Sequence, residues 1–225
     1  EAALAMRGHR LVEIPSVCPV CGGATEIRRV NDVQSLYCTN VRCAAKQIKA
    51  FTLFVSRDAM NIDGLSEATL EKFIDMGFIQ EFADLFHLDR YRERIVEMEG
   101  FGEKSYQKLI GGKTADGKAA SIDAARHTTL PRFLYALGIA GIGLANAKMI
   151  CREFRDDFEQ MLQADAERLA EIDGVGGVLA EAFVSYFQDA ENLRKARALY
   201  QELSIEKREQ AEEGDLSGKS FVITG

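Results

Sequence analysis

The sequence contains no apolar run that approaches the length of a membrane-spanning helix, which argues against an ordinary transmembrane protein. Its first fifteen residues contain no apolar segment followed by a cleavage site, so no secretory signal peptide is predicted. The chain starts without an initiator methionine and stops abruptly at FVITG. We therefore expect it to be a piece of a longer protein.

Positive charge is also scarce, because 28 Lys and Arg residues face 35 Asp and Glu residues, for a net charge of -7. A protein that binds nucleic acid through a basic patch should be positive, so this balance counts against a simple electrostatic binder. The charge is uneven: residues 1–58 carry a net charge of +3 and the rest carries -10. If the acidic part contacts a nucleic acid, backbone amides must supply much of the contact.

No set of residues suggests catalysis by this chain. We find no Ser/His/Asp arrangement and no paired carboxylates, and the three histidines, His9, His87 and His127, are scattered. Hydrophobic residues make up 47% and charged residues 28%, as in ordinary soluble globular proteins. The sequence therefore favours a binding or structural role for this chain.

Four of the five cysteines lie within 26 residues: Cys18, Cys21, Cys38 and Cys43. Their spacing is C-x2-C, sixteen residues, then C-x4-C, and a C-x2-C turn supplies two thiolates to a tetrahedral Zn²⁺. The spacer contains TEIRRV and SLYC around the turn residues Asn31 and Asp32, which predicts a β-hairpin. The glycines after Cys21 would let backbone amides face the sulfurs.

Two alternatives to zinc remain for these cysteines. Two disulfides would suit a secreted protein, which the missing signal peptide disfavours. A redox C-x-x-C would leave the second cysteine pair unexplained. Four thiolates would leave no open coordination position, so we expect a structural zinc ion. The fifth cysteine, Cys151, lies on an apolar helix face and is expected in the core.

Beyond residue 50 strand signals largely disappear, and Gly-containing turns recur between amphipathic helical stretches. The turns are IDGLS at 62–66, MEGFG at 98–102, IAGIG at 139–143 and IDGVG at 172–176. Their first glycines are 36, 41 and 33 residues apart, a period that indicates a repeated supersecondary unit. The unit reads as helix, tight hairpin, helix. A further long helix is predicted from about Asp189 to Leu203.

The pattern hydrophobic-Gly-hydrophobic-Gly has a physical logic. The hydrophobic residue between the glycines is expected to plug into the helix pair, and the glycines to supply positive φ and remove side chains. Amides at the start of the second helix are then open to an anion, and the natural anion is a DNA phosphate. The predicted DNA contacts are Gly64, Gly100, Gly102, Lys104, Gly141, Gly143, Lys148, Gly174 and Gly176.

Other interpretations of these features stay open. The glycines could be helix C-caps in an ordinary bundle. A dinucleotide loop at 141–146 is rejected, because it lacks the third glycine and follows a helix rather than a strand. Lys72, Lys104 and Lys148 follow hairpins and could contact phosphate or simply lie on solvated helix faces. A second basic patch is expected around the cysteines: Arg28, Arg29, Arg42, Lys46 and Lys49.

The order of these parts resembles the C-terminal half of bacterial NAD-dependent DNA ligase. The strings that carry the resemblance are VCPVCGG, SRDAMNIDGLSE, EGFGEKS, FLYALGIAGIG, DGVGGVLAEAF and the terminal LSGKSFVITG. It implies a mainly α fold with a small β zinc ribbon and four helix-hairpin-helix motifs in a compact helical domain. The implied parts are an OB-fold tail or linker (1–15), a zinc finger (16–48), the helix-hairpin-helix domain (49–204), a linker (205–215) and the first strand of a BRCT domain (216–225).

The resemblance also implies a function. The parent enzyme would seal nicks in duplex DNA, in replication and repair, in the bacterial cytoplasm. NAD, Mg²⁺ and the reactive lysine of a K-x-D-G motif would belong to upstream adenylation and OB domains of the same chain. None of the eleven lysines here begins K-x-D-G, so this chain should be inactive alone. Its expected partner is nicked double-stranded DNA, bound without sequence preference.

The sequence departs from the family pattern at two places. Ser66 replaces the usual second glycine of the first hairpin, so that hairpin could bind phosphate less well. The Gly/Lys-rich stretch 111–121 is longer than expected and predicts a loop. Two rival functions remain, a non-catalytic DNA-binding module of a repair nuclease or helicase-type protein, and a helical bundle with no nucleic-acid role.

Overall fold

The computed structural model describes residues 14–30, 33–40, 43–112 and 119–206 of the chain. Most of the expected OB-fold tail, the middle of the 111–121 stretch and the expected BRCT strand lie outside these ranges. So does the 205–215 linker from residue 207 onward. Within the described ranges, no helix is both long enough and apolar enough to cross a membrane.

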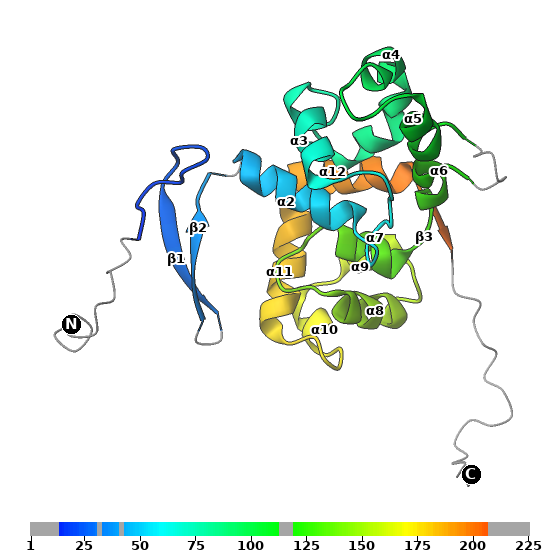
Figure 1. The fold of residues 1–225 in the computed structure, drawn as a ribbon. Helices are drawn as coiled ribbons and strands as arrows, with labels where there is room; N and C mark the ends of the chain where they lie inside the picture. The colour runs from blue at the N-terminus through cyan, green and yellow to red at the C-terminus, as the bar shows by residue number, and fades with distance from the viewer. Residues whose placement is uncertain (1–13, 31–32, 41–42, 113–118, 207–225) are drawn as a thin grey trace, which may run out of the picture.

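The N-terminal part is a small two-stranded ribbon. Strands β1 (Thr25–Val30) and β2 (Val33–Cys38) pair antiparallel, with Thr25 opposite Cys38 and Ile27 opposite Leu36. This confirms the hairpin that the spacer predicted. The register explains how the third cysteine reaches the first two, because Cys38 ends β2 beside the start of β1. Figure 1 shows the ribbon projecting from the helical body.

The rest of the described chain is helical, as expected. Its elements are α2 (Ala44–Val55), α3 (Glu67–Asp75), the 3-10 helix η1 (Phe82–Tyr91), α4 (Arg92–Val96), α5 (Glu103–Leu109), α6 (Ser121–Ala125), α7 (Leu130–Ala136), α8 (Leu144–Glu153), α9 (Phe158–Gln163), α10 (Ala166–Ala170), α11 (Gly177–Gln188) and α12 (Ala190–Gln201). The expected boundary between residues 48 and 49 falls inside α2, which leads from the ribbon into the helical body.

One hydrophobic core holds these helices together, and groups of stacked aromatic rings lie within it. Phe54 of α2 stacks on Phe82 of η1 with ring centroids 4.4 Å apart. Farther along the chain, Phe158 stacks on Tyr200 of α12 at 4.9 Å and meets Phe133 of α7 edge-on at 5.3 Å. Helix α12 matches the helix predicted at 189–203. It packs against both η1 and α11, which lie far apart in the sequence.

One element was not expected. Strands β3 (His127–Thr129) and β4 (Ser204–Glu206) form a parallel pair, with Thr128 opposite Ile205. No signal in the sequence predicted these two short strands, although the mainly helical character beyond residue 50 is confirmed. Three-residue strands are too short to show a two-residue alternation, and this pairing joins segments about 75 residues apart that only the helical packing brings together.

A half-buried ionic cluster lies beside this pair. The Arg126 guanidinium donates to the Glu202 carboxylate at 2.8 Å and to the Glu202 carbonyl oxygen at 3.0 Å, and His87 Nε2 lies 2.6 Å from the same carboxylate. Arg126 also donates to the Phe86 carbonyl oxygen at 2.9 Å. Burial alone raises the pKa of Glu202, but the hydrogen bonds from Arg126 and His87 outweigh it and hold that pKa below its ordinary value.

Glu202→Gln is expected to lower the free energy of unfolding at pH 7 by about 1–2 kcal/mol, because Arg126 loses its charged partner. A carboxyl group with a lowered pKa contributes stability above its unfolded pKa and loses it as pH falls through the folded value. The difference from wild type should therefore shrink below about pH 4. Denaturant melts at pH 7 and pH 3.5 would measure it. An equal difference at both values would contradict the ionic role.

Candidate functional site: a four-cysteine cluster and paired hairpins

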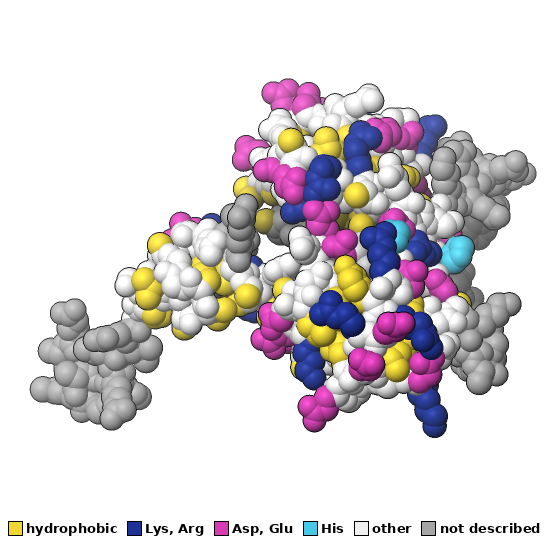
Figure 2. Space-filling model, turned by 90° about the horizontal axis from the view of Figure 1, so that it is seen from above, with side chains coloured by type: hydrophobic (Ala, Val, Ile, Leu, Met, Phe, Trp, Pro, Cys, Tyr) yellow, Lys and Arg dark blue, Asp and Glu magenta, His cyan; other side chains and the backbone are white. Residues whose placement is uncertain are grey.

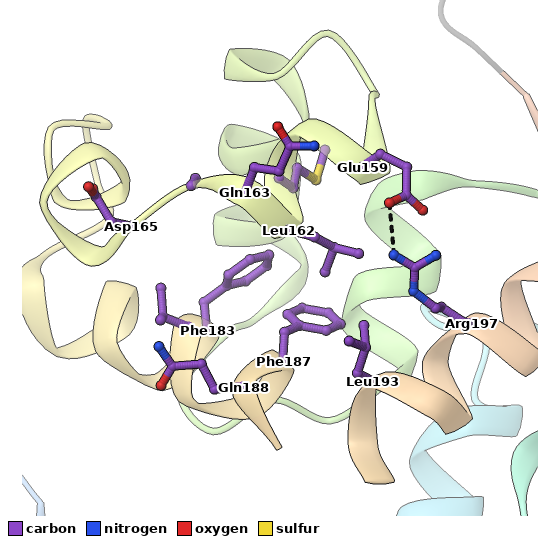
Figure 3. A pocket seen from close by; sticks show the side chains of 12 residues that line it. Glu159, Leu162, Gln163, Asp165, Phe183, Phe187, Gln188, Leu193 and Arg197 are labelled. Atoms are coloured by element: carbon purple, nitrogen blue, oxygen red, sulfur yellow. Dashed lines mark hydrogen bonds and ion pairs between the residues drawn. The ribbon is translucent and has the colours of Figure 1, made fainter. Parts of the chain in front are cut away.

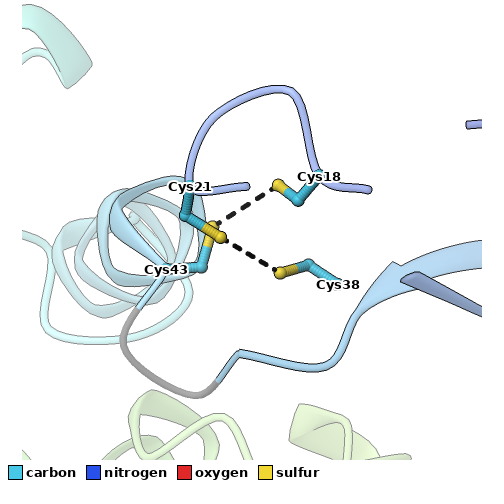
Figure 4. A group of neighbouring side chains, drawn as sticks. All are labelled: Cys18, Cys21, Cys38 and Cys43. Atoms are coloured by element: carbon cyan, nitrogen blue, oxygen red, sulfur yellow. Dashed lines mark hydrogen bonds between the residues drawn. The ribbon is translucent and has the colours of Figure 1, made fainter. Parts of the chain in front are cut away.

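The four clustered cysteines come together as their spacing predicted. Their Sγ atoms all lie within 4.8 Å of one another, with Cys18 and Cys43 3.9 Å apart and Cys21 and Cys38 3.5 Å apart (Figure 4). All four thiols are free, so the disulfide alternative is wrong. A tetrahedron of Zn–S bonds of about 2.3 Å has S–S edges of about 3.8 Å. The two closest pairs lie near this value, so the four cysteines can hold a metal ion after small shifts of their sulfur atoms.

The backbone around the cluster explains the glycines. Gly22 has φ +68°, and its amide donates to the Cys18 carbonyl oxygen at 2.8 Å, which closes the knuckle. At Gly23 an added Cβ would lie 2.9 Å from the Asn40 Cβ, so a side chain does not fit there. Cys43 is the N-cap residue of α2, which anchors the fourth thiol to the helical body.

Hydrogen bonds to sulfur favour thiolates in the knuckle. The Gly23 amide and then the Asn40 side chain lower the pKa of Cys21 to about 6, and the amides of Cys21 and Val20 lower the pKa of Cys18. Burial, together with the neighbouring Cys21 thiol, raises the pKa of Cys38 to about 12. A metal ion would therefore have to displace a proton from Cys38, whereas the turn that carries Cys18 and Cys21 already favours the thiolates that bind metal.

The four predicted hairpins are present, and their first glycines behave as expected. Gly64, Gly100, Gly141 and Gly174 have φ of +92°, +81°, +75° and +79°. The residues that follow them are all buried: Leu65, Phe101, Ile142 and Val175. The plug interpretation is therefore confirmed. We number the hairpins 1 (62–66), 2 (98–102), 3 (139–143) and 4 (172–176).

The second glycines differ from the expectation. Gly102 has φ +45°, but Gly143 and Gly176 have φ -81° and -73°, which any residue can adopt, so positive φ was wrong for these two. A Cβ added at Gly176 would meet no atom within 4 Å, and one at Gly143 would meet only Asn146 Oδ1 at 3.7 Å. What these two glycines provide is open space in front of the amides of α8 and α11.

Hairpins 3 and 4 pack against each other. A Cβ added at Gly141 would lie 2.7 Å from Cδ2 of Leu179, and one at Gly174 would lie 2.7 Å from Sδ of Met149. Each hairpin's first glycine thus receives a side chain from the second helix of the other hairpin. Asn146 adds a polar bridge, because its Nδ2 donates to the Gly174 carbonyl oxygen at 3.1 Å and its Oδ1 accepts from the Gly143 amide at 3.3 Å.

Hairpins 1 and 2 present a different surface at the starts of α3 and α5. The Ser66 hydroxyl oxygen accepts from the Thr69 amide at 3.2 Å, so one amide of α3 is already capped. Glu67 and Glu103 place a carboxylate in the first turns of α3 and α5, and Glu103 pairs with Arg92 at 2.9 Å. Helices α8 and α11 have no acidic residue in their first turns. An anion would therefore meet less negative charge at the starts of α8 and α11 than at those of α3 and α5.

The predicted cationic helpers are divided. Lys104 and Lys148 are exposed, near the starts of α5 and α8. Lys72 instead donates to the Glu99 carbonyl oxygen at 3.4 Å. In the ribbon, Arg28 pairs with Glu26 and lies 5.2 Å over the Tyr37 ring. On the face drawn in Figure 2, cationic and acidic side chains alternate over the helical body.

A cavity of about 480 Å³ lies between α9, α11 and α12. Its floor is apolar, with Leu162, Phe183 and Phe187, and an ion pair between Glu159 and Arg197, 2.8 Å long, lies at its edge (Figure 3). The charged groups that line it satisfy one another or cap a helix. His87 and His127 are apart from it, since His87 contacts Glu202 and His127 begins β3; His9 lies outside the described residues.

Sequence reasoning missed the residues that join hairpins 3 and 4, namely Asn146, Met149 and Leu179. Asn146 and Leu179 both stand three positions after the N-cap glycine of their helix. The two positions are therefore equivalent, but nothing in the sequence shows that they face the neighbouring hairpin. The difference between a polar Asn146 and an apolar Leu179 hid the equivalence.

Comparison with known proteins agrees with this geometry. A family model described as a helix-hairpin-helix motif matches residues 132–195, which contain hairpins 3 and 4. Proteins named DNA ligase are similar along nearly the whole chain. The one from Lachnoclostridium phytofermentans is 51% identical over 99% of this chain, that from Ruminiclostridium cellulolyticum 47% over 96%, and that from Symbiobacterium thermophilum 36% over 94%. The chain spans only 30–32% of the length of these relatives.

Proposed function

We propose that this chain, a helix-hairpin-helix protein homologous to DNA ligases along nearly its whole length, is the DNA-binding region of an NAD-dependent DNA ligase. The parent protein would seal nicks in duplex DNA during replication and repair in the bacterial cytoplasm. NAD and Mg²⁺ would act in adenylation and OB domains that precede this region, so the region alone is expected to be inactive. Its own contribution is to hold the duplex.

The observation that carries this proposal is the open space in front of α8 and α11. Gly143 and Gly176 leave the first amides of both helices uncovered, and neither helix has an acidic residue in its first turn. Free amides and the positive end of the helix dipole together favour an anion such as phosphate. Because hairpins 3 and 4 are packed into one unit, they offer two such sites at a constant separation.

The other predicted contacts take secondary places in this proposal. In hairpin 2, Gly100, Gly102 and the exposed Lys104 add a weaker contact, since Glu103 stands beside the amides. In hairpin 1, Gly64 serves mainly to pack against α5, because Ser66 already caps α3. Lys148 is exposed on α8 and adds one cationic contact next to hairpin 3.

Binding through amides also accounts for the acidic composition. Phosphate is held here by uncharged N–H groups, so a net charge of -7 does not prevent binding in the way it would for a basic patch. The cysteine cluster would hold a structural Zn²⁺, since four thiolates leave no position for a substrate. The ion would fix the ribbon to the start of α2, because Cys43 is the N-cap residue of that helix.

Titration of a nicked duplex with this protein tests the proposal. We expect binding that is indifferent to base sequence and weakens linearly in log–log form as salt rises, with a slope of about -0.9 per phosphate neutralised by a cationic side chain. The two exposed lysines, Lys104 and Lys148, predict a slope of about -2, because uncharged amides do not replace the counterions of a phosphate. Fluorescence anisotropy on two duplexes of unrelated sequence would measure both properties. No binding even at low salt would rule out the proposed function for this region.

A further inference from the structure

Val178 is the most exposed large hydrophobic side chain of the described residues. It is 81% exposed, whereas the next, Ile14, is 63% exposed. It lies in the first turn of α11, directly after Gly176 and Gly177. An isolated apolar residue on a surface is ordinary, but this one stands at the mouth of a proposed phosphate site.

The geometry of α11 directs this side chain toward the partner. Cα–Cβ bonds in a helix tilt toward its N-terminus, so a first-turn side chain projects on the side where the free amides point. The next residue, Leu179, turns instead toward Gly141 of hairpin 3. Farther along the helix, Ala180 and Phe183 enter the core. Val178 is thus excluded from both the hairpin pairing and the core.

The corresponding position in the other hairpins shows what it can do. Counted from each N-cap, Val178 is equivalent to Ala68, Lys104 and Ala145, and all four are exposed. Hairpin 2 has the cationic Lys104 at this position. Hairpin 3 has Lys148 one turn farther along α8. Helix α11 contains no lysine or arginine. Hairpin 4 therefore has to hold its partner without a cationic side chain.

We propose that Val178 packs against the deoxyribose of the nucleotide whose phosphate is bound by hairpin 4, an inference that rests on the proposed DNA-binding function. Each nucleotide presents an apolar C–H face of its sugar next to its phosphate. Contact with that face removes apolar surface of both partners from water and is the same for every base. Val178 thereby supplies hairpin 4 with an affinity that is indifferent to sequence and to salt.

Val178→Ala and Val178→Asn test this contact, with Met76→Ala as a matched control. Met76 is another exposed apolar residue, 37% exposed, at the end of α3 away from its hairpin. Truncating a contact buried on one side should weaken binding to a nicked duplex about five-fold, and the polar asparagine should weaken it more. The log–log salt slope should stay at the wild-type value, because no phosphate contact is lost. The control should bind like wild type.

The outcomes separate the two proposals. If wild type binds and Val178→Ala binds equally well, the sugar contact is wrong while the DNA-binding function stands. If Val178→Ala lowers the magnitude of the salt slope, the residue acts through phosphate and the apolar contact is wrong. If wild type itself does not bind, the proposed function fails first. Thermal melts of the two Val178 variants should coincide with that of wild type, since an 81% exposed side chain contributes little to the core.

Discussion

Removal of the metal by a strong chelator is expected to unfold the ribbon while the helical domain stays folded. The ribbon has almost no core of its own, and its large exposed side chains are Ile14, Val17, Val20, Ile27, Leu36 and Tyr37. Apolar side chains cover much of its surface in Figure 2. A two-stranded hairpin alone is marginal in water, whereas structural zinc supplies about 10–16 kcal/mol in comparable peptides.

Hydrogen exchange with and without chelator would measure this effect. Amides of β1 and β2 should lose protection by several orders of magnitude, whereas those of α7 and α11 should keep theirs. Cys38→Ser should reproduce the loss without chelator, and Cys151→Ala should bind metal normally because Cys151 is buried in the helical core. Protection of β1 that survives metal removal would contradict a structural metal.

The pH dependence of metal binding has a definite sign. Protons compete with the metal for sulfur, so affinity should fall as pH falls, and metal uptake should release protons. Since the pKa of Cys21 is lowered to about 6 and that of Cys38 is raised to about 12, Cys38 should release nearly a full proton near neutral pH, whereas Cys21 should release only a fraction of one. The ribbon is therefore expected to lose its metal on acidification before the helical core unfolds.

Gly176→Asp is expected to weaken DNA binding strongly without loss of stability. Aspartate is a preferred N-cap residue, and the φ of -73° and ψ of 167° at Gly176 suit it. Its carboxylate would accept from the free amides of α11 and occupy the space proposed for phosphate. Losing those hydrogen bonds and adding a like charge should weaken binding at least about 30-fold. The melting temperature should stay the same or rise slightly.

The matched control is Gly176→Asn, which caps the helix with a neutral group of the same size. Its affinity for DNA should lie between those of wild type and Gly176→Asp.

Gly174→Ala should instead lower stability. There φ is +79° and an added Cβ would lie 2.7 Å from Met149 Sδ, so about 1–3 kcal/mol of stability should be lost. Anisotropy titrations and thermal melts on the same preparations would compare them. Wild-type affinity in Gly176→Asp would contradict the phosphate site.

The two glycines of a hairpin therefore have different roles, which their common pattern concealed. In sequence, Gly174 and Gly176 carry the same letter within one repeated string. In the structure, Gly174 has a positive φ and leaves no room for a Cβ beside Met149. Gly176 has neither constraint, since a Cβ there would meet no atom within 4 Å. A glycine that the fold itself does not require is the better indicator of a binding surface.

Spacing along the chain was enough to predict the cysteine cluster, the β-hairpin that closes it and the four hairpin units. These are local features, because a C-x2-C turn and a helix-hairpin-helix unit each depend on residues that are close together in the sequence. The buried residues Leu65, Phe101, Ile142 and Val175 also followed from the pattern. The homology to DNA ligases agrees with the resemblance that these strings carried.

Only the tertiary structure showed how hairpins 3 and 4 are joined and that the space in front of α8 and α11 is open. The Asn146 bridge to Gly174, the Leu179 contact at Gly141 and the pairing of β3 with β4 all connect segments that are distant in the sequence. The hydrophobic periodicity of the sequence does not predict such contacts, because they depend on how the helices pack against one another. The sequence by itself determined the parts of this protein, and packing determined that hairpins 3 and 4 form its open, paired surface.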